Sequence, residues 1–266
     1  MKHNSKPVKV GSSIIGSGNF TIWAGPCSVE SLAQFRETAT QVKKLGATGL
    51  RGGLFKLRTD PTAFQGLGRE AYEIVQKVKH EVGLPFVSEI TDPREIGDMI
   101  DVVDAFQVGS RNMHNYSLLK ELSSIDKPIL LKRGFSATFK EWMLAADYLI
   151  KGGNDQIILC ERGIRTFETA TRNTFDINAI ALAKLETPFP VLADPSHGTG
   201  IAKLVPSIAL AAAAAGADGL LIEVHPDPKH ALSDGYQSLD FPAFAALMDR
   251  MPKLLHAMDR EMAATL

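Results

Sequence analysis

Four side chains with metal-binding atoms stand far apart in the sequence, at Cys27, His197, Glu223 and Asp234. One thiol, one imidazole and two carboxyl groups suit a divalent first-row ion with positions open for substrate, such as Mn²⁺, Fe²⁺, Co²⁺ or Zn²⁺. Their spacing alone matches no short metal-binding motif, so a second interpretation stays open. In it, Cys27 is a small buried apolar residue and His197 a loop or helix-cap residue.

Basic side chains follow many of the short apolar runs of the chain, close to the point where each run ends. They are Arg51, Lys56, Arg58, Arg111, Lys132, Arg133 and Arg162. A lone arginine is usually a solvated surface charge, but so many cations in equivalent places are poorly explained that way. They predict a pocket for an anionic ligand, because guanidinium and ammonium groups bind carboxylate and phosphate.

The elements that must position these residues are expected to form a closed (β/α)8 TIM barrel. Predicted strands span residues 20–24, 48–51, 85–89, 105–109, 128–132, 156–161, 190–193 and 219–224. Predicted helices span 31–45, 69–82, 140–151, 178–184, 208–215 and 241–258, with weaker patterns at 93–99 and 115–122. Sites of such barrels lie at the carboxyl ends of the strands, where the polar residues above are found.

Residues 8–20 are interpreted as two short strands around Gly16-Ser17-Gly18-Asn19, forming a hairpin that plugs one end of the barrel. The predicted domain organisation is therefore an N-terminal extension with a hairpin at 1–19 and one catalytic (β/α)8 barrel at 20–266. Within the barrel, period-two alternation puts Lys132 on the same strand face as Leu130, and Glu223 on the same face as Leu221. Each charged residue at a strand end therefore follows an apolar residue that faces inward.

Composition argues against several classes of partner. The formal net charge is −1, which leaves no global excess of positive charge for binding a nucleic-acid backbone. The longest apolar stretch, 208–215, is too short to cross a bilayer, and no secretory signal is visible. Two cysteines, Cys27 and Cys160, do not make a disulfide framework. We expect a cytoplasmic enzyme with neither nucleic acid nor membrane as partner.

Several long segments, in order, resemble the type Iβ branch of the 3-deoxy-arabino-heptulosonate 7-phosphate (DAHP) synthase family. More distantly, they resemble 3-deoxy-manno-octulosonate 8-phosphate synthase. The segments are AGPCSVES (24–31), RGGLFKLRT (51–59), FQGLG (64–68), VGSRNMHN (108–115), LLKRG (130–134), ILCERGIRTFETATR (158–172), DPSHGTG (194–200) and EVHPDP with ALSDG (223–235). The resemblance covers nearly the whole chain, from residue 24 to about 248.

This resemblance implies condensation of phosphoenolpyruvate with erythrose 4-phosphate and water, the first step of the shikimate pathway. It implies a divalent metal, most simply Mn²⁺, held by the catalytic residues Cys27 and His197 together with Glu223 and Asp234. The residues that it implies for substrate binding are Arg51, Lys56, Arg111, Lys132 and Arg162 for phosphoenolpyruvate, Glu89 for water, and Arg58 and Thr59 for the aldose phosphate.

A catalytic role is also expected for Lys56, as the proton donor to the developing alkoxide, with a pKa lowered by neighbouring cations. The resemblance further implies a homo-oligomer, tetramer or dimer. Because only about twenty residues precede the barrel, no inhibition by aromatic amino acids through an appended domain is expected.

Two departures from the family pattern leave the aldose open. Relatives typically have Lys-Pro-Arg-Thr-Ser where this chain has Leu57 and Asp60 in Lys-Leu-Arg-Thr-Asp. Asp60 adds negative charge near the second phosphate, so another aldose phosphate, such as arabinose 5-phosphate, is an alternative substrate. A non-catalytic phosphosugar-binding barrel is a second alternative. A Schiff-base aldolase with Lys132 as nucleophile is a third.

Overall fold

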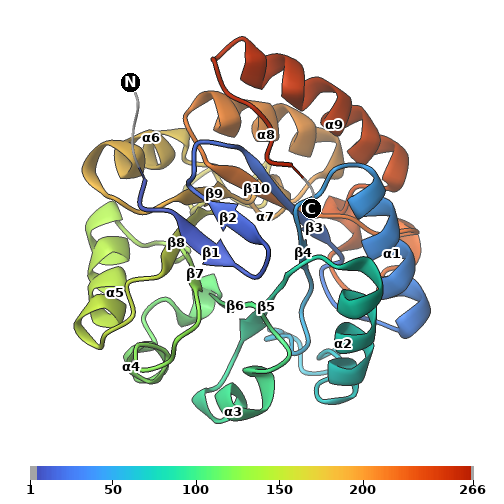
Figure 1. Cartoon of the computed structure of the whole chain (residues 1–266), viewed down its shortest axis with the longest axis horizontal. Coiled ribbons are helices and arrows are strands. Elements are labelled where there is room, and N and C mark those ends of the chain that lie inside the picture. Colours follow the sequence, from blue (N-terminus) through green and yellow to red (C-terminus); the bar gives the residue numbers. More distant parts are fainter. Residues whose placement is uncertain (1–4, 265–266) are drawn as a thin grey trace.

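The structure is a computed structural model that describes residues 5–264 of the chain (Figure 1). Eight strands make the barrel: β3 (Thr21–Gly25), β4 (Gly49–Arg51), β5 (Phe86–Ile90), β6 (Ala105–Val108), β7 (Ile129–Lys132), β8 (Ile157–Glu161), β9 (Val191–Ala193) and β10 (Gly219–Glu223). All neighbours are parallel, and β10 closes the ring by pairing with β3. The predicted (β/α)8 barrel is confirmed, with each predicted strand in place.

Helices surround the strands as the sequence pattern predicts. The main ones are α1 (Leu32–Lys44), α2 (Glu70–Val82), α3 (Ile96–Met99), α4 (Tyr116–Leu122), α5 (Phe139–Lys151), α6 (Ile177–Glu186), α8 (Val205–Ala214) and α9 (Phe241–His256). Both weak patterns are helical, since α4 fills one, and a 3-10 turn (Pro93–Glu95) with α3 fills the other. One short helix, α7 (Pro195–Thr199), was not predicted, and it carries His197.

An antiparallel hairpin of β1 (Val8–Val10) and β2 (Ser13–Ile15) lies across one end of the barrel (Figure 1). The predicted position of its turn is wrong. Val10 pairs with Ser13, so the turn is Gly11-Ser12, and Gly11 has the positive φ of 56° that a two-residue hairpin turn favours at its first position. Gly16-Ser17-Gly18-Asn19 instead forms the connection from the hairpin into β3.

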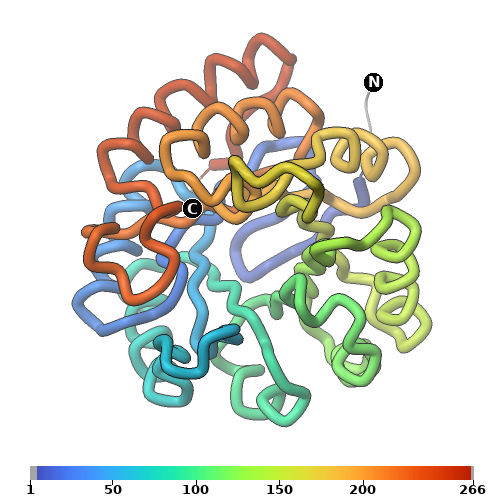
Figure 2. Tube along the Cα trace, turned by 180° about the vertical axis from the view of Figure 1, so that it is seen from behind, coloured from blue at the N-terminus to red at the C-terminus, as the bar shows by residue number. Residues whose placement is uncertain are grey.

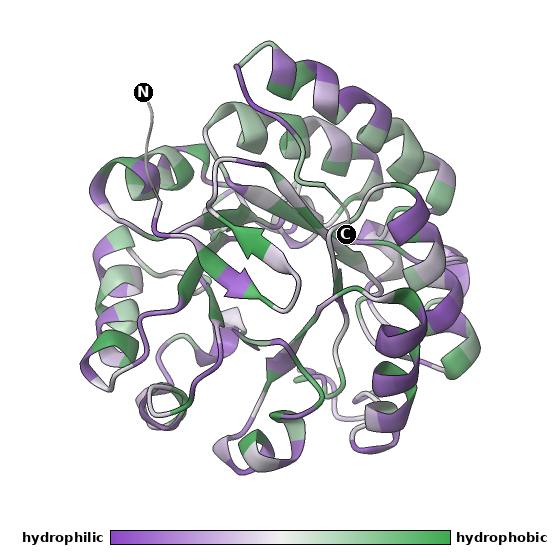
Figure 3. Ribbon diagram, viewed as in Figure 1, coloured by the Kyte–Doolittle hydropathy of each residue, from purple (hydrophilic) through white to green (hydrophobic). Residues whose placement is uncertain are grey.

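Apolar packing forms two layers, one between strands and helices and one inside the barrel. The inner layer joins hairpin residues Val8, Val10 and Ile15 to inward-facing strand residues such as Leu130 and Leu221, so the hairpin does plug that end. Figure 3 shows apolar residues on the strands and polar residues on the outer faces of the helices. None of the helices within residues 5–264 combines the length and apolar character that a bilayer crossing requires.

Candidate active site

The end of the barrel opposite the hairpin carries the loops that follow the strands (Figure 2). A polar cavity of about 280 Å³ opens there. Six basic side chains line it: Lys56, Arg58, Arg111, Lys132, Arg162 and Arg172. Thr59, Glu89, His197 and Asp234 complete the predicted residues on its wall, and Asp60, Phe135 and Tyr236 also contribute. The predicted strand-end residues therefore do converge on one cavity.

The remaining predicted residues lie just below this wall. Cys27 and Arg51 line a smaller cavity of about 20 Å³ together with Lys56, Glu89 and His197. Arg51 does not reach the larger cavity, because its guanidinium donates to Glu223 Oε1 (2.9 Å) and to the Pro26 carbonyl (2.8 Å). All twelve site residues predicted from the sequence thus gather at the carboxyl ends of the strands, where Arg51 and Glu223 are paired with each other.

Two arginines of the cavity are free to bind an anion. Arg162 is 2% exposed, and its guanidinium donates to the Gly163 carbonyl at 3.2 Å. Burial lowers the pKa of Arg162 to about 10, so it still carries its charge at neutral pH. Within residues 5–264, neither Arg162 nor Arg111 has a carboxylate within 4.0 Å. Their donors are therefore not neutralised by a protein group.

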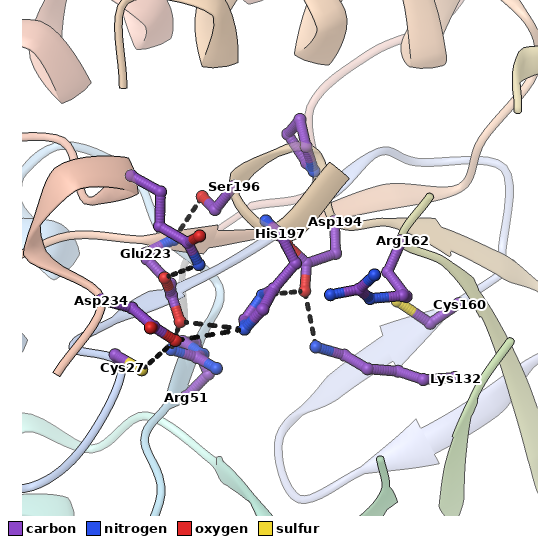
Figure 4. Close-up of polar contacts among 12 residues, drawn as sticks. Cys27, Arg51, Lys132, Cys160, Arg162, Asp194, Ser196, His197, Glu223 and Asp234 are labelled. Atoms are coloured by element: carbon purple, nitrogen blue, oxygen red, sulfur yellow. Dashed lines mark hydrogen bonds and ion pairs between the residues drawn. The ribbon is translucent and has the colours of Figure 1, made fainter. Parts of the chain in front are cut away.

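Four candidate metal ligands meet beside this cavity (Figure 4). Donor atoms of Cys27, Glu223 and Asp234 lie within 4.8 Å of one another. His197 Nε2 lies 3.5 Å from Glu223 Oε1 and 3.9 Å from Asp234 Oδ2. The ring closure explains the convergence, since Cys27 follows β3, Glu223 ends β10 and these two strands are paired.

Asp234 comes from the loop between β10 and α9, and that loop is fixed from outside. Asp234 adopts a left-handed backbone with φ of 48°, which aspartate tolerates better than most residues. Glu30, in the loop after β3, accepts a hydrogen bond from the Leu232 N–H at 2.8 Å and contacts His225 Nε2 at 3.3 Å. These contacts hold the Asp234 loop against the segment that carries Cys27.

His197 is oriented by Asp194, a residue absent from the predicted site set. Asp194 Oδ1 accepts the backbone N–H of His197 (2.9 Å) and thereby caps α7, while Oδ2 contacts His197 Nδ1 at 2.7 Å. His197 Nε2 is therefore directed at the cluster. Carboxylates orient metal-binding histidines in the same way, by accepting the N–H of the other ring nitrogen. Burial lowers the pKa of His197 to about 4, so the imidazole is neutral at pH 7 and able to bind a metal.

Asp194 also joins the candidate metal ligands to the basic side chains of the cavity, because Lys132 Nζ donates to its Oδ2 at 2.5 Å (Figure 4). Burial alone would raise the pKa of Asp194, but His197 and Lys132 hold it well below its usual range. The carboxylate is therefore ionised at neutral pH. Sequence reasoning placed Asp194 at a strand end in DPSHGTG without giving it a role, since two simultaneous partners cannot be read from one segment.

Three further residues missed by the sequence analysis contact the acidic candidate ligands or one another. Gln237 donates to Glu223 Oε2 at 2.5 Å and accepts from Arg172 Nη1 at 2.7 Å. Tyr236 donates to Asp234 Oδ1 at 3.3 Å. Arg172 closes the resembling segment 158–172 and the other two follow ALSDG, so their nearness to recognised segments was the only available signal.

The expected lowering of the Lys56 pKa is wrong. Lys56 Nζ donates to Cys27 Sγ and lies 3.2 Å from Asp234 Oδ2. Burial alone would lower the pKa of Lys56, but Cys27, Asp234 and the nearby Glu223 carboxylate raise it above its ordinary value. The sequence indicated the neighbouring cations, whereas in the fold the ammonium points at the acidic ligands and stays protonated.

The segment expected to bind the aldose phosphate lies on the rim of the cavity. Arg58 Nη1 is buried and has no hydrogen-bond partner among the described residues, so it has a donor to spare for a ligand. The Asp60 carboxylate accepts from the Thr62 N–H (2.9 Å) and Thr62 Oγ1 (2.7 Å), and these bonds lower its pKa. Asp60 is thus an anion on the wall, held in a local turn.

The donor set fits a divalent ion. The sulfur and the carboxylate oxygens lie within 4.8 Å of one another, and the His197 imidazole joins them on the carboxylate side, 3.5 Å from Glu223 Oε1; first-row ions of intermediate softness prefer such a set of donor atoms. Burial, followed by the Glu223 charge, raises the pKa of Cys27 to about 12 in the protein alone. A cation among these ligands would favour the thiolate, so loading would release a proton.

Comparisons with known proteins show to which family the chain belongs. The family model described as "DAHP synthetase I family" matches residues 4–257. A phospho-2-dehydro-3-deoxyheptonate aldolase of Thermotoga maritima is 47% identical over 251 residues, covering 94% of this chain and 74% of the relative. A 2-dehydro-3-deoxyphosphooctonate aldolase of Hydrogenovibrio crunogenus is 32% identical, covering 87% of this chain and 89% of the relative.

Solved structures give the same result. The DAHP synthase crystal structure from Thermotoga maritima superposes with a TM-score of 0.95 at 45% identity, covering 98% of this chain and 77% of that one. A truncated form of the Thermotoga maritima synthase has a TM-score of 0.91 at 42% identity, with 98% and 96% covered. The family model spans nearly the whole described barrel, and the aldolase of Thermotoga maritima is 47% identical to this chain. The chain therefore belongs to the DAHP synthetase I family.

Proposed function

We propose that the chain condenses phosphoenolpyruvate with erythrose 4-phosphate and water to give DAHP and phosphate, the first step of the shikimate pathway. The observation that carries this proposal is the single cavity where six cations stand beside the cluster of Cys27, Glu223 and Asp234. Both substrates are anionic, and the aldehyde of erythrose 4-phosphate needs a Lewis acid to polarise its carbonyl group. Relatives named for the seven-carbon product support the same substrates.

Phosphoenolpyruvate carries a phosphate and a carboxylate, and the cavity offers cations to both. Arg162, Arg111 and Lys132 stand on its wall, and the two arginines have free donors. Forked guanidinium groups hold an anion in a defined orientation, which positions C3 of the enol for attack. Arg51, which the resemblance implied as a further contact, does not line this cavity, and we propose that it supports the pocket through its pair with Glu223.

We assign the divalent ion to Cys27, His197, Glu223 and Asp234, with Mn²⁺ as the ion to test first. The chemistry that such an ion supplies when bound is polarisation of the aldehyde carbonyl of the aldose. Within the protein, Asp194 orients His197 while Gln237 and Arg51 fix Glu223, so the ligands are held in place by their neighbours.

In the proposed reaction, C3 of phosphoenolpyruvate forms a bond with the aldehyde carbon, and positive charge develops at C2. Water adds at C2 and gives up one proton, which replaces the proton donated to the aldose alkoxide. The bond between C2 and the bridging oxygen then breaks, so that phosphate leaves with the second proton of the water and C2 becomes a ketone. Lys56 is the proposed donor of a proton to the new alkoxide, since its ammonium lines the cavity beside Asp234. Glu89, also on the wall and held by Gln107 at 3.2 Å, is proposed to orient the water.

The second phosphate is assigned to Arg58 and Thr59, because both lie on the rim and the arginine has an unused buried donor. Arabinose 5-phosphate remains the alternative aldose, since an octulosonate relative is 32% identical. The Schiff-base alternative is disfavoured. Lys132 is engaged with Asp194 at 2.5 Å, and an ion-paired ammonium has no lone pair to attack a carbonyl.

The test is a phosphate-release assay with phosphoenolpyruvate, Mn²⁺ and a panel of four- and five-carbon aldose phosphates, with and without EDTA. We expect metal-dependent release that is fastest with erythrose 4-phosphate. Faster release with arabinose 5-phosphate would change the substrate. No release with any aldose would favour the non-catalytic alternative. Full activity in EDTA would refute the proposed dependence on a metal. A cytoplasmic location stays a prediction. Assembly into a homotetramer or dimer is also a prediction, and measurement of the molecular mass in solution tests it.

A further inference from the structure

Phe135 stands on the wall of the cavity among three arginines. The guanidinium carbons of Arg111, Arg162 and Arg165 lie 5.4, 4.8 and 4.7 Å from the centre of its ring. All three distances are within the roughly 6 Å over which an aromatic face attracts a cation. Three arginines from two different loops therefore share one neutral partner.

The loop that carries Phe135 is held rigidly. Arg133 pairs with Glu161 (3.1 Å) and Asp176 (2.7 Å), and its Nε donates to the Ala137 carbonyl at 3.0 Å. The Phe135 carbonyl accepts the backbone N–H of Arg165 at 2.6 Å, which ties the loop after β7 to the loop after β8. The Phe135 backbone is thus tied to both strands whose tips carry cavity residues.

We infer that Phe135 is a positioning residue for the anion-binding arginines, an inference that rests on the proposed function. A carboxylate in this place would also fix Arg111 and Arg162, but it would neutralise them and compete with the ligand. An aromatic face orients guanidinium groups while leaving their N–H donors free for phosphate or carboxylate. Arg165 is exposed and does not line the cavity, so its positive charge contacts the Phe135 ring without facing the ligand.

The test separates the ring's electrons from its bulk. Phe135→Leu removes the aromatic face, Phe135→Tyr retains it, and Phe139→Leu is the matched control at a phenylalanine packed against Trp142 on α5. Binding of inorganic phosphate and of phosphoenolpyruvate is measured by isothermal titration calorimetry. We expect Phe135→Leu to weaken both by roughly three- to tenfold, with Phe135→Tyr and the control within about twofold of the parent protein.

In steady-state assays the KM for phosphoenolpyruvate should rise by the same factor while kcat stays near the parent value. Parent-like phosphate affinity in Phe135→Leu overturns the inference, and so does equal weakening by Phe135→Tyr. Phe135 belongs to neither apolar core, so folding should persist; Phe135→Met provides a second aliphatic variant should Phe135→Leu melt early. Failure of DAHP formation would refute the proposed function alone, because anion binding needs no turnover.

Discussion

Replacing Asp194 with asparagine should weaken both the fold and the metal site. The substituted amide can still accept the His197 backbone N–H through its oxygen, so the cap of α7 survives. Its NH₂ group, however, would face two donors in place of Oδ2, namely His197 Nδ1 (2.7 Å) and Lys132 Nζ (2.5 Å). The Lys132–Asp194 side chains are 4% and 1% exposed, so the loss leaves a nearly buried ammonium without its counter-charge.

Removing one partner of a buried ion pair typically costs about 3–5 kcal/mol, and we expect roughly 3 kcal/mol because Lys132 borders a polar cavity. Loss of the carboxylate behind His197 should also weaken Mn²⁺ binding by about 10- to 100-fold. Urea unfolding gives the first quantity, and calorimetric titration with Mn²⁺ gives the second.

The matched control is Glu81→Gln, which breaks the Arg36–Glu81 pair at a similar distance of 2.7 Å but with side chains 40% and 37% exposed. Because both groups of this pair are in contact with water, the substitution should leave the free energy of unfolding and the Mn²⁺ affinity unchanged within the error of each measurement. If Asp194→Asn behaved like this control in both measurements, the role given to Asp194 would be refuted.

Three further predictions concern single side chains of the site. In a metal-free Cys160→Ala protein, the rate at which a disulfide reagent labels Cys27 should keep rising from pH 7 to 10, because the Cys27 pKa is raised to about 12. A rate that levels off near pH 8.5, as for an unfolded chain, would contradict the argument that burial raises this pKa. Lys56→Met should lower kcat at saturating substrate by about 100-fold or more, and near-normal turnover would end its assignment as proton donor. Asp60→Ser should lower the KM for the aldose phosphate about two- to fivefold without changing that for phosphoenolpyruvate, since it removes an exposed anion from the rim; equal effects on both would contradict the assignment of Arg58 to the second phosphate.

Most of the barrel could be predicted because its strands are buried on both faces and appear as uninterrupted apolar runs. The hairpin turn could not, because Gly11-Ser12 and the glycines at 16 and 18 give competing turn signals, and only pairing with β1 decides between them. Helix α7 has five residues, fewer than the window over which helical periodicity can be recognised.

The site shows a similar division. The convergence of its candidate ligands and cations was predictable because parallel strands bring their carboxyl ends to one face, whatever the sequence distance between them. The Lys56 pKa was not, since the direction of a long side chain depends on contacts from the loops after β3 and after β10 at once. Asp194, Gln237 and Phe135 were missed for the same reason, because each acts on a ligand or cation through contacts across loops.

Anomalous X-ray diffraction from crystals grown with Mn²⁺ and phosphoenolpyruvate tests the central claim most directly. One strong manganese peak within bonding distance of Cys27, His197, Glu223 and Asp234 is predicted, with the phosphoenolpyruvate anions against Arg111 and Arg162. A peak elsewhere in the barrel, or a bound phosphoenolpyruvate away from this cavity, would contradict the account.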